Sequence, residues 1–266
     1  MSELQGVADT LFIPLEARIF ASRRFPEYFF DEKALALEPH IPPNSIREKS
    51  SEYSLMASVA RYYNMDAMTR AFIAKHGACN IVNLGVGFET AYFRLNQPDA
   101  TFYEVDLPAV IAARKSLLGE HTNEVLIGCD LFDPAWIAQV DATRPTLLIA
   151  SGVFQYFTEE KVIAFIHALQ DAFNTAELIF DATNETGIKY TNKYVQKTGN
   201  AEALMYFYVN DGAAFAQKTN TTLLEERVFF TDARKLLAKK LGLYTRIAMR
   251  VVDNKRRAIL LHLKLK

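Results

Sequence analysis

Short apolar runs alternate with stretches of helical spacing over most of the chain. Five runs are rich in apolar residues and short enough to cross a sheet once. They cover residues 81–84, 101–105, 124–127, 146–150 and 178–180. Because crossovers between parallel strands are right-handed, this alternation predicts a doubly wound, mostly parallel α/β sheet. A ligand is then expected at the carboxyl edge of the strands, where the strand order reverses.

The two ends of the chain have other patterns. Residues 1–76 show helical spacing without a strand pattern, which predicts an N-terminal helical lid or flank. Residues 245–252 and 257–265 alternate apolar and polar positions, which predicts a C-terminal antiparallel hairpin and brings the sheet to seven strands. We therefore expect one compact domain, with a core over 77–266 and a substrate-side insertion at about 185–234.

A glycine turn follows the first apolar run. Gly85 and Gly87 permit positive φ and let bare backbone approach a ligand. Asp106 ends the second run, about 20 residues after Gly87, where an acid can hold the two hydroxyls of a ribose. Turn and acid together predict a nucleoside site.

The residues after this turn narrow the choice of cofactor. A dinucleotide site needs a third glycine at position 90, where this chain has Thr90. Glu89 would also place negative charge beside a pyrophosphate. S-adenosylmethionine has no phosphate and carries a sulfonium cation, which carboxylates stabilise. A nicotinamide-dependent oxidoreductase stays as an alternative that only the turn and the acid support.

Two further strand tips carry polar residues. Asp130 follows the third apolar run, and Ser151 follows the fourth. Since the carboxyl ends of parallel strands share one edge, both are expected near the glycine turn. A lone Asp after a strand is also often a helix cap, so Asp130 has this second interpretation.

Several segments match a known family pattern. They are IVNLGVGFET (81–90), FRL (93–95), YEVDLP (103–108) and IASGVFQYFTEEKV (149–162) in the core, and IPLEAR (13–18) with Ser22, Arg23 and Asp31 near the N-terminus. These segments resemble the leucine carboxyl methyltransferase family, and the N-terminal ones resemble its bacterial branch. The family includes the tetracenomycin-type polyketide O-methyltransferases.

The resemblance implies a class I methyltransferase, Rossmann-like fold that uses S-adenosylmethionine. Gly85 and Gly87 would then lie against the methionine end of the cofactor, and Asp106 would bind the ribose. The other implied residues are Asp130 and Leu131 at the adenine, Arg61 at the methionine carboxylate, and Arg18 or Arg23 reaching the site from the lid.

Ser151 departs from the family pattern, which has Glu before Gly152. A carboxylate there would pair with the cofactor's ammonium, whereas a hydroxyl is a weaker partner because it carries no charge. This difference motivates the alternative of a non-catalytic protein that binds S-adenosylmethionine.

Charge and composition exclude several classes of partner. Thirty basic and 31 acidic residues give a net charge of −1, so no basic field attracts nucleic acid. Two cysteines without a CxxC motif indicate a reducing compartment and no structural metal site. The N-terminus lacks a leader pattern, and no apolar run is long enough to span a membrane, so we expect a cytoplasmic protein.

We expect an O-methyltransferase that acts on a carboxylate or hydroxyl of a polyketide-like small molecule. Methyl transfer is an in-line displacement, so positioning dominates the catalysis. No His lies at a strand tip, which favours a carboxylate because it needs no base. Arg23 could orient such an acceptor, and Tyr156 could line its site. The carboxyl terminus of a protein is the alternative acceptor, and the oligomeric state is left open.

Overall fold

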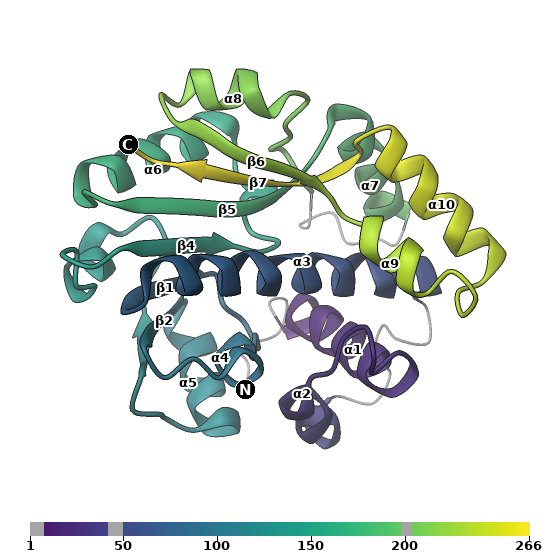
Figure 1. Ribbon diagram of the computed structural model, residues 1–266, viewed down its shortest axis with the longest axis horizontal. Coiled ribbons are helices and arrows are strands. Elements are labelled where there is room, and N and C mark those ends of the chain that lie inside the picture. The colour runs from purple at the N-terminus through teal and green to yellow at the C-terminus, as the bar shows by residue number, and fades with distance from the viewer. Residues whose placement is uncertain (1–7, 42–49, 198–203) are drawn as a thin grey trace.

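The computed structural model describes residues 8–41, 50–197 and 204–266 (Figure 1). Within them, one seven-stranded sheet has the order β3-β2-β1-β4-β5-β7-β6. Strands β1 to β5 are parallel, and β7 is antiparallel to both β5 and β6. This confirms the expected doubly wound sheet with antiparallel strands on its C-terminal side. The strands are β1 (Cys79–Leu84), β2 (Ala100–Asp106), β3 (Glu124–Gly128), β4 (Thr146–Ala150), β5 (Ala176–Thr183), β6 (Thr222–Val228) and β7 (Ala258–Lys264).

The centre of the sheet is buried on both faces. Every residue of β1 and of β4 is buried, as continuous apolar runs in parallel strands predict. The strand order reverses between these two strands, because β2 follows β1 on one side and β4 lies on the other. The crevice at a ligand-binding switch point therefore lies beyond the carboxyl ends of β1 and β4.

Helices cover both faces of the sheet. On one face, α3 (Glu52–His76) packs with α9 (Thr231–Leu236) and α10 (Leu243–Asn254) (Figure 1). On the other face, α6 (Glu159–Ala172) and α8 (Gly212–Lys218) contribute to the core. None of the helices in the described ranges is long and apolar enough to cross a membrane. The remaining helical segments are α1 (Ala8–Arg24), α2 (Glu32–Leu37), η1 (Glu38–His40), α4 (Ala91–Leu95), α5 (Pro108–Leu118), η3 (Pro134–Gln139), η4 (Phe154–Tyr156) and α7 (Glu185–Lys197).

Helix α1 connects the N-terminal segment to the switch point. It packs against α2 and α3, and a Cβ atom added to Gly87 would lie 3.0 Å from Cδ2 of Leu11. The first turns of α1 therefore reach the glycine turn that follows β1. Residues 1–7 and 42–49 of the expected lid lie outside the described residues.

The prediction of a strand over 245–252 is wrong, because these residues belong to α10. Leu243, Ile247 and Val251 recur every four residues and lie on its exposed side, which is helical spacing. Besides β5, the antiparallel partner of β7 is instead β6, which falls in the segment expected as an insertion. Helices α9 and α10 separate the two strands, so they do not form a tight hairpin.

Candidate active site

The backbone after β1 is bare at two positions. Gly85 and Gly87 have φ of +65° and +51°, a region that side chains disfavour. A Cβ atom at Gly85 would also lie 2.6 Å from Cγ2 of Val153. The Gly85 amide donates a 2.8 Å hydrogen bond to the carbonyl oxygen of Val105, which fixes the turn beside β2.

Asp106, at the end of β2, contacts this turn directly. Its Oδ2 accepts a hydrogen bond from the Gly87 amide at 2.8 Å, and its Oδ1 accepts one from the Leu107 amide at 2.7 Å. Burial raises the pKa of Asp106, although both hydrogen bonds lower it. A carboxylate has about four acceptor positions, so further positions on Asp106 are available to ribose hydroxyls.

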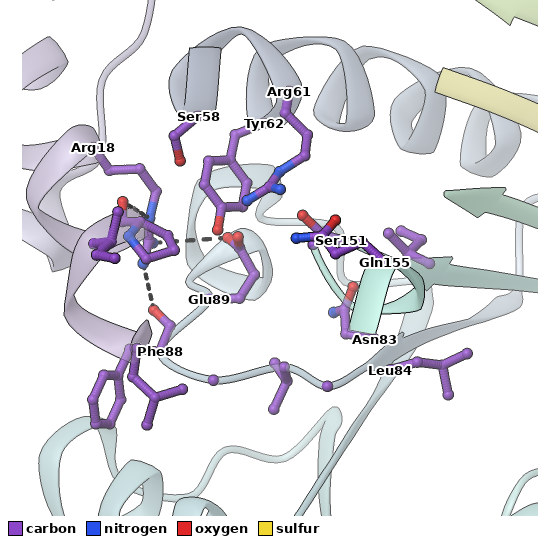
Figure 2. A pocket seen from close by; sticks show the side chains of 18 of the residues that line it. Arg18, Ser58, Arg61, Tyr62, Asn83, Leu84, Phe88, Glu89, Ser151 and Gln155 are labelled. Atoms are coloured by element: carbon purple, nitrogen blue, oxygen red, sulfur yellow. Dashed lines mark hydrogen bonds and ion pairs between the residues drawn. The ribbon is translucent and has the colours of Figure 1, made fainter. Parts of the chain in front are cut away.

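A cavity of about 400 Å³ opens beside the glycine turn (Figure 2). Among the predicted site residues, Arg18, Arg61, Gly85, Gly87, Ser151 and Tyr156 line it. Figure 2 shows Arg18 and Arg61 reaching inward from the lid and from α3, with Glu89 between them. The structure thus brings together residues of the lid, of α3 and of two strand tips.

Other predicted residues lie outside the cavity wall. Oδ1 of Asp130 accepts a hydrogen bond from the Phe132 amide at 2.9 Å, so this side chain caps a turn. Leu131 is buried in the core, where its carbonyl oxygen accepts a 2.8 Å hydrogen bond from the Trp136 indole. The exposed Arg23 forms an ion pair with Glu38 on the surface. The adenine contacts of Asp130 and Leu131 stay a prediction.

A buried ionic cluster joins the lid to the residues after the glycine turn. Nη1 of Arg18 lies 2.9 Å from Oδ2 of Asp31 and also contacts Thr90, while its Nη2 donates to the Phe88 carbonyl at 2.6 Å (Figure 2). Nη1 of Arg94 lies 3.0 Å from the same Asp31 oxygen. We call Arg18, Asp31, Thr90, Arg94 and Glu89 the Asp31 cluster.

Charge in the cluster keeps its carboxylates ionised. Burial raises the pKa of Asp31, but Arg18 and Arg94 outweigh it and hold the pKa below its ordinary value. Burial also raises the pKa of Glu89, but Arg94 and, to a smaller extent, Arg18 outweigh it and hold the pKa below its ordinary value. Oε1 of Glu89 lies 2.6 Å from Arg94. The family resemblance includes both Arg18 and Asp31, but nothing in the sequence indicates that the two side chains pair.

Arg61 forms a second buried ion pair. Its Nη1 lies 3.2 Å from Oδ2 of Asp181, on β5. Oδ1 of Asp181 accepts a 2.5 Å hydrogen bond from the Gly152 amide, so one carboxylate holds both groups. Burial lowers the pKa of Arg61, but Asp181 raises it by more. Asp181 directly follows the expected strand 178–180, so the position of the strand tip could have identified it.

Several polar atoms of the cavity wall have no hydrogen bond within the part of the chain that the structure describes. They are Oγ of Ser58, Nε of Arg61, Oε2 of Glu89 and Oγ of Ser151, all buried. Buried polar atoms are normally paired, so these atoms indicate where a polar ligand binds.

The sheet order, the glycine turn after β1 and the acid at the tip of β2 define the class I methyltransferases. Solved structures agree on the fold. A DUF574 family protein from Streptomyces avermitilis matches with a TM-score of 0.61 and 15% identity, over 94% of this chain and 96% of that one. Magnesium protoporphyrin IX methyltransferase from Synechocystis PCC 6803, solved with bound S-adenosylhomocysteine, matches with a TM-score of 0.51 and 13% identity, over 81% and 88%.

The chain belongs to the leucine carboxyl methyltransferase family, whose model matches residues 8–170. Tetracenomycin polyketide synthesis O-methyltransferase from Streptomyces glaucescens is 26% identical over 194 residues, which are 73% of this chain and 72% of that protein. Leucine carboxyl methyltransferase 1 from Bos taurus is 26% identical over 155 residues, 45% of this chain and 47% of that protein. This chain is therefore an S-adenosylmethionine-dependent methyltransferase.

The residues around the cavity fit this cofactor. S-adenosylmethionine supplies an activated methyl group on a sulfonium cation, and its methionine end carries one charge of each sign. Arg61 can bind the carboxylate, and Gly85 and Gly87 line the same cavity. The missing Cβ atoms of these two glycines leave room for Val153 and Leu11 of the chain itself, so they permit the turn to pack closely. Oγ of Ser151 makes no hydrogen bond within the described residues and can accept one from the ammonium, while the ionised Glu89 suits the sulfonium.

Proposed function

We propose that this chain transfers the methyl group of S-adenosylmethionine to an oxygen of a small organic acceptor. The observation that carries the proposal is the mixed character of the cavity wall. Leu11 and Ile13 of α1, together with Phe229, give it an apolar part, while Arg61 and Ser151 give it a polar part. Its volume of about 400 Å³ lies in the range of small-molecule sites.

The charged side chains of the cavity favour a hydroxyl acceptor over a carboxylate. Among the described lining residues the cations are Arg18 and Arg61, and each contacts a buried carboxylate, of Asp31 and Asp181 respectively. A carboxylate acceptor would therefore find no unpaired cation, and Glu89 would repel it. The lack of a His at a strand tip favours a carboxylate acceptor, but the charges of the cavity oppose one. We therefore propose that the acceptor is a hydroxyl, such as a phenol.

A hydroxyl acceptor has to be oriented and has to lose its proton. Oε2 of Glu89 makes no hydrogen bond within the described residues and lies in the cavity wall, so it can accept one from the acceptor hydroxyl. Because arginines hold the pKa of Glu89 low, it acts by orienting the hydroxyl and receives the proton only as the methyl group arrives. Tyr156, partly exposed in the same wall, can pack against the acceptor.

The two relatives support different acceptors. The Streptomyces glaucescens relative is described as an O-methyltransferase of polyketide synthesis, which favours a small molecule. The Bos taurus relative is described as a leucine carboxyl methyltransferase, which keeps a protein C-terminal carboxylate as the second candidate, although that match covers less of the chain.

The proposal is tested with methyl-labelled S-adenosylmethionine and three sets of acceptors: phenols and alcohols, small carboxylic acids, and a peptide that ends in leucine. The product is then treated with alkali, which hydrolyses methyl esters and leaves methyl ethers intact. We expect an alkali-stable product from the first set. An alkali-labile product would refute the hydroxyl proposal. Tight binding of S-adenosylhomocysteine without transfer to any set would support the non-catalytic alternative.

A further inference from the structure

Asp181 holds two separate parts of the cavity wall. One carboxylate oxygen lies 3.2 Å from Nη1 of Arg61, and the other accepts the Gly152 amide at 2.5 Å. Arg61 and Gly152 line the cavity, and Asp181 lies behind them with 8% of its surface exposed. The carboxylate is therefore part of the support for the wall at the ends of β4 and β5.

The adjacent strand tip lacks a charge of its own. Ser151 precedes Gly152, and its Oγ is buried without a hydrogen bond in the described residues. A hydroxyl can accept a hydrogen bond from an ammonium group but cannot neutralise it. Burying an ammonium without a nearby anion is costly, so a negative charge has to come from elsewhere. Asp181 is the carboxylate that contacts the backbone of this strand tip.

The zwitterionic methionine end of the cofactor can bind beside a buried ion pair, because each of its charges then lies near one of opposite sign. The methionine end of the cofactor carries a carboxylate and an ammonium, and the Arg61–Asp181 pair carries the two opposite charges. About two of the four acceptor positions on the Asp181 carboxylate are used by Arg61 and Gly152. The pair is neutral as a whole, so it accepts a neutral zwitterion without leaving a buried charge unpaired.

We propose that Asp181 is a positioning residue of the methionine subsite: it holds Arg61 and the Gly152 peptide in place, and its carboxylate supplies the negative charge that selects the α-ammonium group. Ser151 completes the subsite as a neutral acceptor. The inference rests on the cofactor assignment and not on the identity of the methyl acceptor.

The same strand offers a matched control. Glu177 lies four residues before Asp181 in β5 and is similarly buried. It forms an ion pair with Lys75, in the same helix as Arg61, at 3.1 Å. Neither Glu177 nor Lys75 lines the cavity. Glu177 also contacts Nε2 of His262 at 2.6 Å, and Lys75 is more exposed than Arg61. Glu177→Gln therefore removes a buried carboxylate and an α3–β5 ion pair from the same strand, away from the subsite.

The experiment measures binding by calorimetry for two ligands: S-adenosylhomocysteine, and its analogue in which hydrogen replaces the α-amino group. A lost hydrogen bond to a charged group weakens binding about tenfold or more, so the wild type should prefer the amine by that factor. We expect Asp181→Asn to reduce the preference to about twofold and Glu177→Gln to retain it. Ser151→Glu in the Asp181→Asn background should restore the preference, because it returns a carboxylate to the neighbouring strand tip.

Other results would overturn the inference. If Asp181→Asn weakens both ligands equally and the amine preference persists, Asp181 has only a structural role. Should this variant not fold, by circular dichroism, the comparison moves to Asp181→Glu, which keeps the charge. That variant is expected to retain at least about a fivefold preference, and loss of the preference would refute the charge role. A wild type that binds neither ligand would refute the cofactor site itself.

Discussion

Asp31→Asn tests whether buried charge holds the lid in place. Asp31 is fully buried and contacts both Arg18 and Arg94, at 2.9 and 3.0 Å. Its Oδ1 also caps α2 by accepting the Ala34 amide at 2.9 Å. Asn caps a helix about as well as Asp, so the substitution removes the charge and retains the cap. Arg18 and Arg94 then lose one shared carboxylate, while Glu89 still lies 3.8 Å from Arg18 and 2.6 Å from Arg94.

The expected loss of stability is large. Removing one partner of a buried ion pair costs about 3–5 kcal/mol, and because Arg94 keeps Asp66 and Glu89 we expect the lower end of that range, which lowers the melting temperature of a chain of this size by about 6–12 °C. The free energy of unfolding is measured by urea titration at pH 7, with Glu120→Gln as the control. Glu120 pairs with Lys115 on the surface, at 2.8 Å, and such a pair contributes at most about 1 kcal/mol.

The pH dependence adds a second measurement. The pKa of Asp31 is lower in the folded state than its ordinary value of 3.8, so the stabilisation of the folded state by its carboxylate is fully present above pH 3.8. It is lost as the pH falls through the folded-state pKa. The stability gap between wild type and Asp31→Asn should therefore narrow below pH 3.8. A gap at pH 7 no larger than that of Glu120→Gln would refute the role of the cluster.

Three other predictions concern the glycine turn and its surroundings. Gly85→Ala should weaken S-adenosylhomocysteine binding at least tenfold in calorimetry. The added Cβ would lie 2.6 Å from Cγ2 of Val153, and a φ of +65° costs about 1–2 kcal/mol for a residue with a side chain. Unchanged affinity would contradict this prediction. Asp106→Ala should weaken the same binding by at least about threefold, and equal affinity would remove the ribose assignment. Burial raises the pKa of Glu104 to about 7, so the wild type loses stability as the pH rises from 4.5 to 7. In urea titrations, the free energy of unfolding of Glu104→Gln should rise relative to that of the wild type from pH 5 to pH 8. A difference that stays constant over this range would refute the prediction.

Parts of the fold with strong local patterns could be predicted from the sequence. The strands over 81–84 and 146–150 are apolar because both of their faces are buried, and the structure places them at the centre of the sheet. β6 was missed because it is an edge strand with only partial burial, where Glu225 and Glu226 follow Leu223 and Leu224 and no alternation is visible.

Pairs between distant residues could not be predicted. Arg61 and Asp181 are 120 residues apart, and only the packing of α3 across the sheet brings them together. Arg18 was expected near the site because of the family resemblance, but its contact with Asp31 depends on how α1 and α2 fold over the residues after β1. Spacing along the chain thus identifies strand tips, whereas the ionic contacts between elements require the structure.

The two ionic contacts also support the proposal of an uncharged acceptor beside a cationic cofactor. Each lining arginine faces a carboxylate, so neither contributes net positive charge to the cavity. Glu89 adds a carboxylate whose pKa is held low, and one of its oxygens makes no hydrogen bond within the described residues. The sulfonium is therefore attracted and an anionic acceptor is repelled. Methyl transfer removes the sulfonium charge, so the same carboxylate that favours cofactor binding attracts the product S-adenosylhomocysteine less and favours its release.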